Sequence, residues 1–117
     1  MKLKIRKKPR KFEVGLHKKI TLKDMGYINL SNDEQVTFIT KDKKKYDVAK
    51  KNWGFYATPS INHRLKKEGF KTALVKNKFN RYFIMLVDFK KLSEFKNYCK
   101  KEKQVVIKWL TNGFKKS

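Results

Sequence analysis

The sequence predicts an α+β fold in which an antiparallel sheet is packed against two helices. Three observations lead to this prediction: runs of alternating or β-branched residues mark several strands, one segment has an apolar stripe at helical spacing, and turn residues separate these elements. The chain has 117 residues, of which 39% are hydrophobic and 14% aromatic. That length and composition suffice for one domain with its own core, because aromatic side chains supply much of the burial that offsets chain entropy.

Residues 1–12 are expected to form a basic extended arm. This segment holds seven basic residues and no acidic residue, and Pro9 opposes a helix. The functional interpretation is an arm that orders when it contacts a polyanion, and the plainer alternative is a frayed, solvated terminus. The candidate phosphate contacts in the arm are Arg6, Lys7, Lys8, Arg10 and Lys11.

Residues 13–112 are predicted to be a single α+β domain, followed by a basic tail at 113–117, because no internal repeat or low-complexity linker divides them. The first half of this region is mainly β. A polar connection at 41–44 predicts a hairpin, and Gly54 marks a bend. Strands are expected at 20–22, 27–30, 35–40, 46–49 and 55–57.

Residues 58–69 are predicted to be a short helix. Thr58 can cap its start, Pro59 suits the first helical position and Gly69 suits a left-handed stop. Strands at 70–75 and 82–87 then flank a hairpin loop. The second of these strands is apolar at every position, which is typical of a central strand covered on both faces.

The strongest helix signal runs from Lys90 to Lys103. Leu92, Phe95 and Cys99 recur at positions i, i+3 and i+7 and make an apolar stripe. A strand at 104–110 follows. Residues 53–110 then have the order β-α-β-β-α-β, and one arrangement that this order allows is the ferredoxin-like split unit.

Charge is the main functional signal in the sequence. The chain carries 32 Lys and Arg residues against 10 Asp and Glu residues, a formal net charge of +22, and all but four of the basic residues are lysine. Self-repulsion of this size opposes the compact state unless an anion offsets it. Lysine is a compact, hydrated point charge, so the pattern favours loose, salt-sensitive attraction to phosphates. A lysine-favouring coding bias would explain lysine over arginine but not the scarcity of acidic residues.

Residues 53–64 form the densest candidate site. A helix that began at Thr58 would offer N–H donors to an anion, with Ser60 and Arg64 on one face. An exposed Trp53 or Tyr56 would then stack on a base. The alternative assigns the hydroxyls to capping and the aromatic rings to the core. The candidate contacts are Trp53, Tyr56, Thr58, Ser60, Asn62, His63, Arg64 and Lys67.

The loop at 77–80 is the second candidate site. Phe79 stands at the expected tip with Lys78 before it and Arg81 after it, so its ring can stack on an unpaired base beside basic side chains. The alternative is a turn residue folded back onto the core. If the sheet has a bare face, Tyr82 or Phe83 would be its platform.

Catalysis and cofactor binding are poorly supported. His17 and His63 are isolated, so no metal site is expected, and no glycine-rich phosphate loop predicts a cofactor. Cys99 lies on the apolar stripe and is predicted to be an inert core thiol. One cysteine fits a reducing compartment, and neither a membrane span nor a secretory signal is present in the sequence, so a cytoplasmic location is expected.

The sequence leaves three functions open. The first is a non-enzymatic nucleic-acid-binding protein, with RNA favoured over duplex DNA because no helix-turn-helix or zinc finger is recognisable. The second is an accessory module that docks on an acidic enzyme or complex through apolar anchors such as Trp53, Tyr56 or Trp109. The third is a small enzyme acting on an anionic substrate near Thr58 to Arg64.

Overall fold

The computed structural model describes residues 1–16 and 20–112 of the chain. Within these residues the elements confirm the predicted α+β class. In chain order they are β1 (Lys2–Val14), β2 (Ile20–Asn29), β3 (Gln35–Ile39), β4 (Lys45–Lys51), β5 (Gly54–Ala57), α1 (Arg64–Lys67), β6 (Phe70–Lys76), β7 (Tyr82–Asp88), the 3-10 turn η1 (Phe89–Lys91), α2 (Leu92–Lys101) and β8 (Val105–Trp109).

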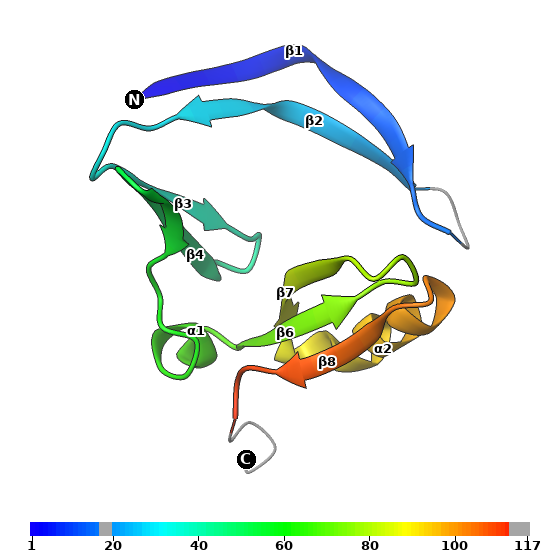
Figure 1. The fold of residues 1–117 in the computed structure, drawn as a ribbon. Coiled ribbons are helices and arrows are strands. Elements are labelled where there is room, and N and C mark those ends of the chain that lie inside the picture. Colours follow the sequence, from blue (N-terminus) through cyan, green and yellow to red (C-terminus); the bar gives the residue numbers. More distant parts are fainter. Residues whose placement is uncertain (17–19, 113–117) are drawn as a thin grey trace.

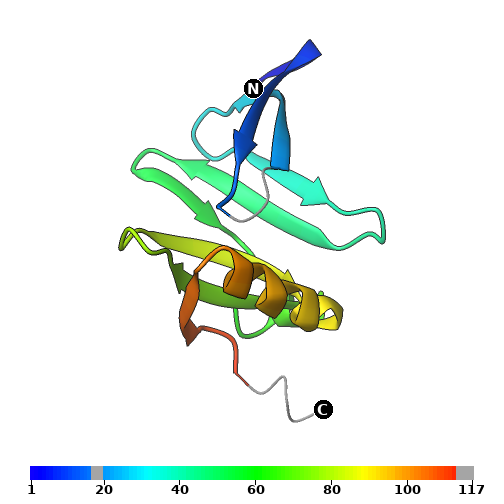
Figure 2. The ribbon, with the colours of Figure 1, turned by 90° about the vertical axis from the view of Figure 1, so that its right-hand side faces the viewer.

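The strands form three small antiparallel sheets arranged around an opening. Strands β1 and β2 pair with each other alone and arch over the molecule, β3, β4 and β5 form the second sheet, and the third has the order β7-β6-β8 (Figure 1). Helix α2 covers one face of the third sheet (Figure 2). The opening therefore lies between the β1–β2 arch and the two other sheets.

The N-terminal segment is extended, as expected, but it is paired rather than standing apart as an arm. Strand β1 pairs with β2 from Lys2 opposite Asn29 to Val14 opposite Ile20, with one irregularity between Ile5 and Arg10. The physical reason is a period-two apolar pattern, carried by Leu3 and Ile5 before the irregularity and by Phe12 and Val14 after it, which the dense positive charge obscures. The predicted tail at 113–117 and His17 lie outside the described residues.

The third sheet contains four of the twelve residues that are buried in the described chain, namely Thr72, Ala73, Val75 and Val87. Ala73 and Val75 of its central strand β6 are fully buried, and Phe95 of α2 packs edge-on against Trp109 of β8 with ring centroids 5.7 Å apart. Strand β7 was expected to be central, and this was wrong: it is an edge strand, and Tyr82 and Ile84 are exposed. Its continuous apolar run therefore combines exposed residues at 82–84 with the buried Val87.

The ferredoxin-like arrangement does not form. That fold needs the strand before the first helix to join the same sheet as the following strands, whereas β5 pairs with β4 in a different sheet. Only two residues, Asn52 and Trp53, separate β4 from β5, so the local hairpin closes at little entropic cost. Helix α1 has only four residues, too few to act as a crossover helix.

Only Arg64–Lys67 of the helix predicted over 58–69 is helical. The Thr58 backbone N–H donates to the Asp47 carbonyl at 3.0 Å, which ties this residue to the sheet and delays the helix until Arg64. Gly69 does adopt the left-handed conformation, with φ of +91°, as predicted. Leu65, 1% exposed, is the apolar residue by which α1 is anchored. None of the described helices is long and apolar enough to cross a membrane.

The pairing of β1 with β2 can be tested by substituting Gly26, which lies against the backbone of β1. A Cβ at this position would overlap the Lys4 carbonyl oxygen and lie 3.0 Å from the Ile5 Cα, and the φ of +140° is itself unfavourable for other residues. Gly54 has a similar φ of +144° but open space around it. Each alanine substitution carries a backbone cost of about 1–3 kcal/mol, and Gly26→Ala adds a clash. We expect Gly26→Ala to accelerate amide hydrogen exchange across residues 2–14, and Gly54→Ala to leave those rates unchanged.

Candidate nucleic-acid interface

The segment from Thr58 to Arg64 is bonded into the fold. The Arg64 guanidinium pairs with the Asp47 carboxylate, which also accepts a hydrogen bond from the Thr37 hydroxyl. The Thr58 hydroxyl donates to the Gln35 side-chain carbonyl at 3.0 Å, and Ser60 Oγ accepts from the Arg64 backbone N–H at 3.2 Å. Three of the predicted phosphate contacts thus join this segment to the second sheet and α1.

The helix start expected at Thr58 is wrong, because α1 begins at Arg64 and spans only four residues, so no helical N–H groups are offered to an anion at Thr58. Anion binding by the predicted residues of this segment stays a prediction. Asn62, His63 and Lys67 are exposed nearby, and His63 makes no side-chain capping bond. The alternative of a small enzyme at this position stays a prediction.

Trp53 and Tyr56 form an exposed aromatic pair. Trp53, in the turn between β4 and β5, is 68% exposed, and Tyr56 of β5 is 46% exposed. Their rings stack with centroids 5.9 Å apart and planes inclined by 26°. The alternative that put these rings in the core is therefore wrong, and their outer faces are available to a further planar group.

The β6–β7 loop presents Phe79 to solvent. The Asn77 side-chain oxygen accepts from the Phe79 backbone N–H at 2.9 Å and from the Arg81 backbone N–H at 3.0 Å, and Asn80 adopts a φ of +62°. These bonds hold a tight turn. Phe79 is 62% exposed, and the Lys78 ammonium lies 5.3 Å from its ring centroid. The tip is thus an aromatic ring beside a cation, as the stacking hypothesis requires.

Two further lysines line the same hollow as Lys78. Lys78, Lys101 at the end of α2 and Lys103 in the following turn line one hollow of about 350 Å³ together with Leu16, and we call it the three-lysine pocket. Three lysines that line one hollow give it a positive charge, which an anion in the hollow would offset. Lys101 and Lys103 are not among the site residues predicted from the sequence. The lysine cluster at the end of the helix was visible, but its proximity to the β6–β7 loop is a tertiary feature.

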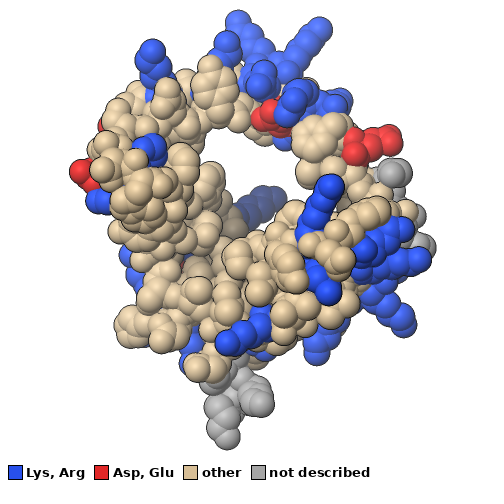
Figure 3. Space-filling view, in the orientation of Figure 1, with Lys and Arg blue, Asp and Glu red and all other residues tan. Residues whose placement is uncertain are grey.

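The basic residues of β1 divide into two groups. Arg6 and Arg10 both pair with Asp24, at 3.7 and 3.1 Å, so part of their charge is neutralised within the hairpin. Lys7, Lys8 and Lys11 are exposed. Lysine and arginine side chains project from the outer side of the arch (Figure 3). This outer side is a broad basic surface that supplements the three-lysine pocket.

Cys99 is buried on the inner face of α2, and burial raises the pKa of its thiol. It is therefore protonated at neutral pH, when a thiol is a poor nucleophile. Among residues 1–16 and 20–112, no group of three or more His, Cys, Asp or Glu side chains is arranged to hold a metal ion.

No protein-family model, curated protein or solved structure matches this chain. Function is therefore inferred from the residues and their arrangement alone.

Asp47 is expected to matter for stability. It is 8% exposed and accepts bonds from Thr37 and Arg64, so Asp47→Ala leaves both donors without their partner. We expect the free energy of unfolding, measured by urea titration, to fall by about 1–3 kcal/mol. Asp42→Ala, in the exposed β3–β4 turn, is the matched control and should change it by about 0.5 kcal/mol or less. Equal effects of the two substitutions would contradict a structural role for the Asp47 contacts.

Proposed function

We propose that the protein is a non-enzymatic nucleic-acid-binding protein of the cytoplasm that favours single-stranded RNA. The observation that carries this proposal is the three-lysine pocket beside the exposed Phe79 ring. A nucleic acid repeats phosphates and bases along its chain. The lysines of the pocket can bind phosphates, and the Phe79 ring can stack on a base. The net charge of +22 supports the same partner class, because a polyanion offsets the self-repulsion of the chain.

The binding mechanism is electrostatic attraction followed by stacking. Lys78, Lys101 and Lys103 neutralise phosphates and release condensed counterions, while Phe79 stacks on a base adjacent to those phosphates. Lysine makes no planar bidentate fork, so this contact set carries little sequence information. The Trp53–Tyr56 pair is a second stacking platform, and the lysines on the outer side of the arch steer the polyanion toward the protein.

Single-stranded RNA is favoured over duplex DNA because stacking on Phe79 or Trp53 needs a base whose face is free. Unpaired bases in loops and single strands present that face, whereas a duplex buries it. No described helix carries arginines along one face as a groove-reading element does.

The three-lysine pocket is tested by salt dependence. We expect the combined variant Lys78→Ala, Lys101→Ala, Lys103→Ala to bind single-stranded oligouridine more weakly. The slope of log affinity against log salt concentration should become shallower by about 2, because each phosphate contact on a single strand contributes about 0.7. Fluorescence anisotropy across a salt series measures both quantities.

A matched control removes the same charge elsewhere. Lys41, Lys91 and Lys96 are exposed lysines of the β3–β4 turn, η1 and α2. Changing these three to alanine should leave the slope close to that of the parent protein. If both combined variants lower the slope equally, binding depends on net charge and the pocket has no special role.

Phe79 is tested by comparison with Phe55, which is equally exposed at 62%. Loss of one stacked base costs about 1–3 kcal/mol, so we expect Phe79→Ala to weaken oligouridine binding about 5- to 150-fold at constant salt with the salt slope unchanged. Phe55→Ala should bind like the parent protein. An unchanged affinity in Phe79→Ala would remove base stacking from the mechanism.

A further inference from the structure

Strand β7 forms an outer edge of the third sheet in the described chain. Natural sheets protect exposed edges with lysine, proline or bulges, because the unpaired backbone groups of an edge attract other strands. The chain places 32 basic residues among 117, yet none lies between Tyr82 and Phe89. Tyr82 and Ile84 remain exposed on this edge. The edge therefore has the composition of a strand that pairs with a partner.

The same region borders the opening beneath the arch. One hollow of about 440 Å³ is lined by Val14 and Ile20 of the β1–β2 hairpin, by Phe83 and Met85 of β7 and by Tyr98 of α2. Figures 1 and 2 both show β7 as the strand of its sheet that lies toward the arch. A strand added to β7 would thus meet the apolar side chains of the hairpin.

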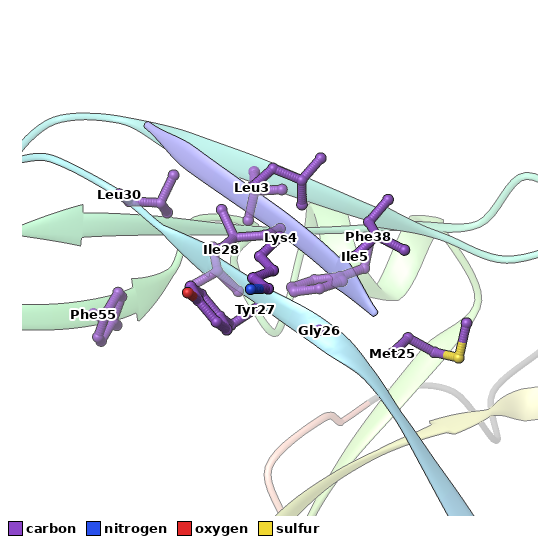
Figure 4. A pocket seen from close by; sticks show the side chains of 12 residues that line it. Leu3, Lys4, Ile5, Met25, Gly26, Tyr27, Ile28, Leu30, Phe38 and Phe55 are labelled. Atoms are coloured by element: carbon purple, nitrogen blue, oxygen red, sulfur yellow. The ribbon is translucent and has the colours of Figure 1, made fainter. Parts of the chain in front are cut away.

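A second apolar hollow lies at the other end of the arch. It has a volume of about 400 Å³, and the hairpin lines one side of it with Leu3 and Ile28 while the second sheet contributes Phe38 and Phe55 (Figure 4). Lys4 is the only charged residue among those that line it. The inner side of the arch is therefore apolar at both ends, in contrast to its basic outer side.

The occupant of the opening must offer hydrogen bonds as well as apolar groups. The Gln104 side-chain oxygen belongs to the first hollow and is buried without a hydrogen-bond partner in the described chain, and the β7 edge presents backbone N–H and C=O groups. A hydrocarbon ligand would satisfy neither. An extended polypeptide supplies backbone donors and acceptors along its length and apolar side chains at alternate positions.

The size and charge of the opening further limit which kinds of molecule can bind in it. The arch is closed at its tip by the Leu16 backbone N–H, which donates to the Glu102 carboxylate at 2.6 Å, and the opening passes between arch and body (Figure 3). Such an enclosed space accepts one segment of chain rather than a folded domain. The three lysines beside Leu16 and the basic exterior favour negative charge on that segment.

We propose that the opening binds one extended segment of an acidic partner protein, which adds as a strand to the edge of β7. Alternate apolar side chains of the segment occupy the hollow that Phe83 and Met85 of β7 share with the hairpin, and the intervening acidic side chains face lysines at the rim. Lys78 and Phe79 line this hollow as well as the proposed RNA site, so a bound segment and RNA would compete for these two side chains. Peptide binding is nevertheless measured in the absence of RNA and does not require it.

The test uses a synthetic peptide of alternating valine and glutamate, about eight residues long, which is a usual strand length. We expect the full-length protein to bind it with saturation in fluorescence anisotropy. Within residues 82–88, exchange of the amides whose N–H groups point away from β6 should slow about tenfold at saturation, as expected when an open edge becomes hydrogen-bonded. The amides of β8, the opposite edge of the same sheet, should keep their rates. The same peptide N-methylated at every residue keeps its charges but loses its backbone donors on both edges, and it should not bind.

Two matched variants complete the test. Ile84→Glu places a negative charge on the β7 edge, and Ile107→Glu places it on the β8 edge at a similarly exposed isoleucine. Ile84→Glu should weaken peptide binding at least about tenfold, the equivalent of 1.4 kcal/mol, while Ile107→Glu binds normally.

Absence of binding, equal binding of the N-methylated peptide, or protection of β8 without protection of β7 would each overturn the proposal. So would a concentration-dependent dimer that protects the same amides, because the occupant would then be a second copy of this chain.

Discussion

The pairing of β1 with β2 is the interaction on which the rest of the molecule depends. It converts the most basic segment of the chain into a ladder with lysines on its outer side and apolar residues such as Leu3 and Val14 toward the opening. Without that pairing, the positive charges of β1 would repel one another along a solvated chain, and its apolar residues would have no common face. The Leu16–Glu102 hydrogen bond then joins the far end of the hairpin to the turn after α2.

Charge and burial are in tension throughout this protein. The tightly buried residues are few and gather mainly around β6, whereas large apolar residues such as Phe12, Ile84 and Phe79 stay exposed. A chain with a net charge of +22 gains little from packing its lysine-rich surfaces together. The two proposed partners address different features of the chain, its net positive charge and its exposed apolar surface. In these proposals a nucleic acid would compensate positive charge, and an extended acidic segment would cover apolar surface inside the opening.

Local signals predicted the elements that depend on neighbouring residues. The stripe of Leu92, Phe95 and Cys99 identified α2, and the loop at 77–80 identified the β6–β7 hairpin together with Lys78 and Phe79. Prediction failed where a distant contact overrides a local preference. Thr58 and Pro59 have the residue types of a helix start, but the Thr58 N–H is taken by the Asp47 carbonyl, and the helix begins six residues later.

The sequence by itself determined the α+β class, the strand and helix order of the second half, and the net charge of +22, because these follow from periodicity and from composition. Only the tertiary structure decided that β5 belongs to a different sheet from β6 and that β7 lies at an edge. It also decided that Lys101 and Lys103 line the same pocket as Lys78. The reason is that sheet order and side-chain clusters depend on which segments meet across long stretches of chain. A residue pattern specifies which face of a strand is apolar, but it does not specify which strand lies next to it.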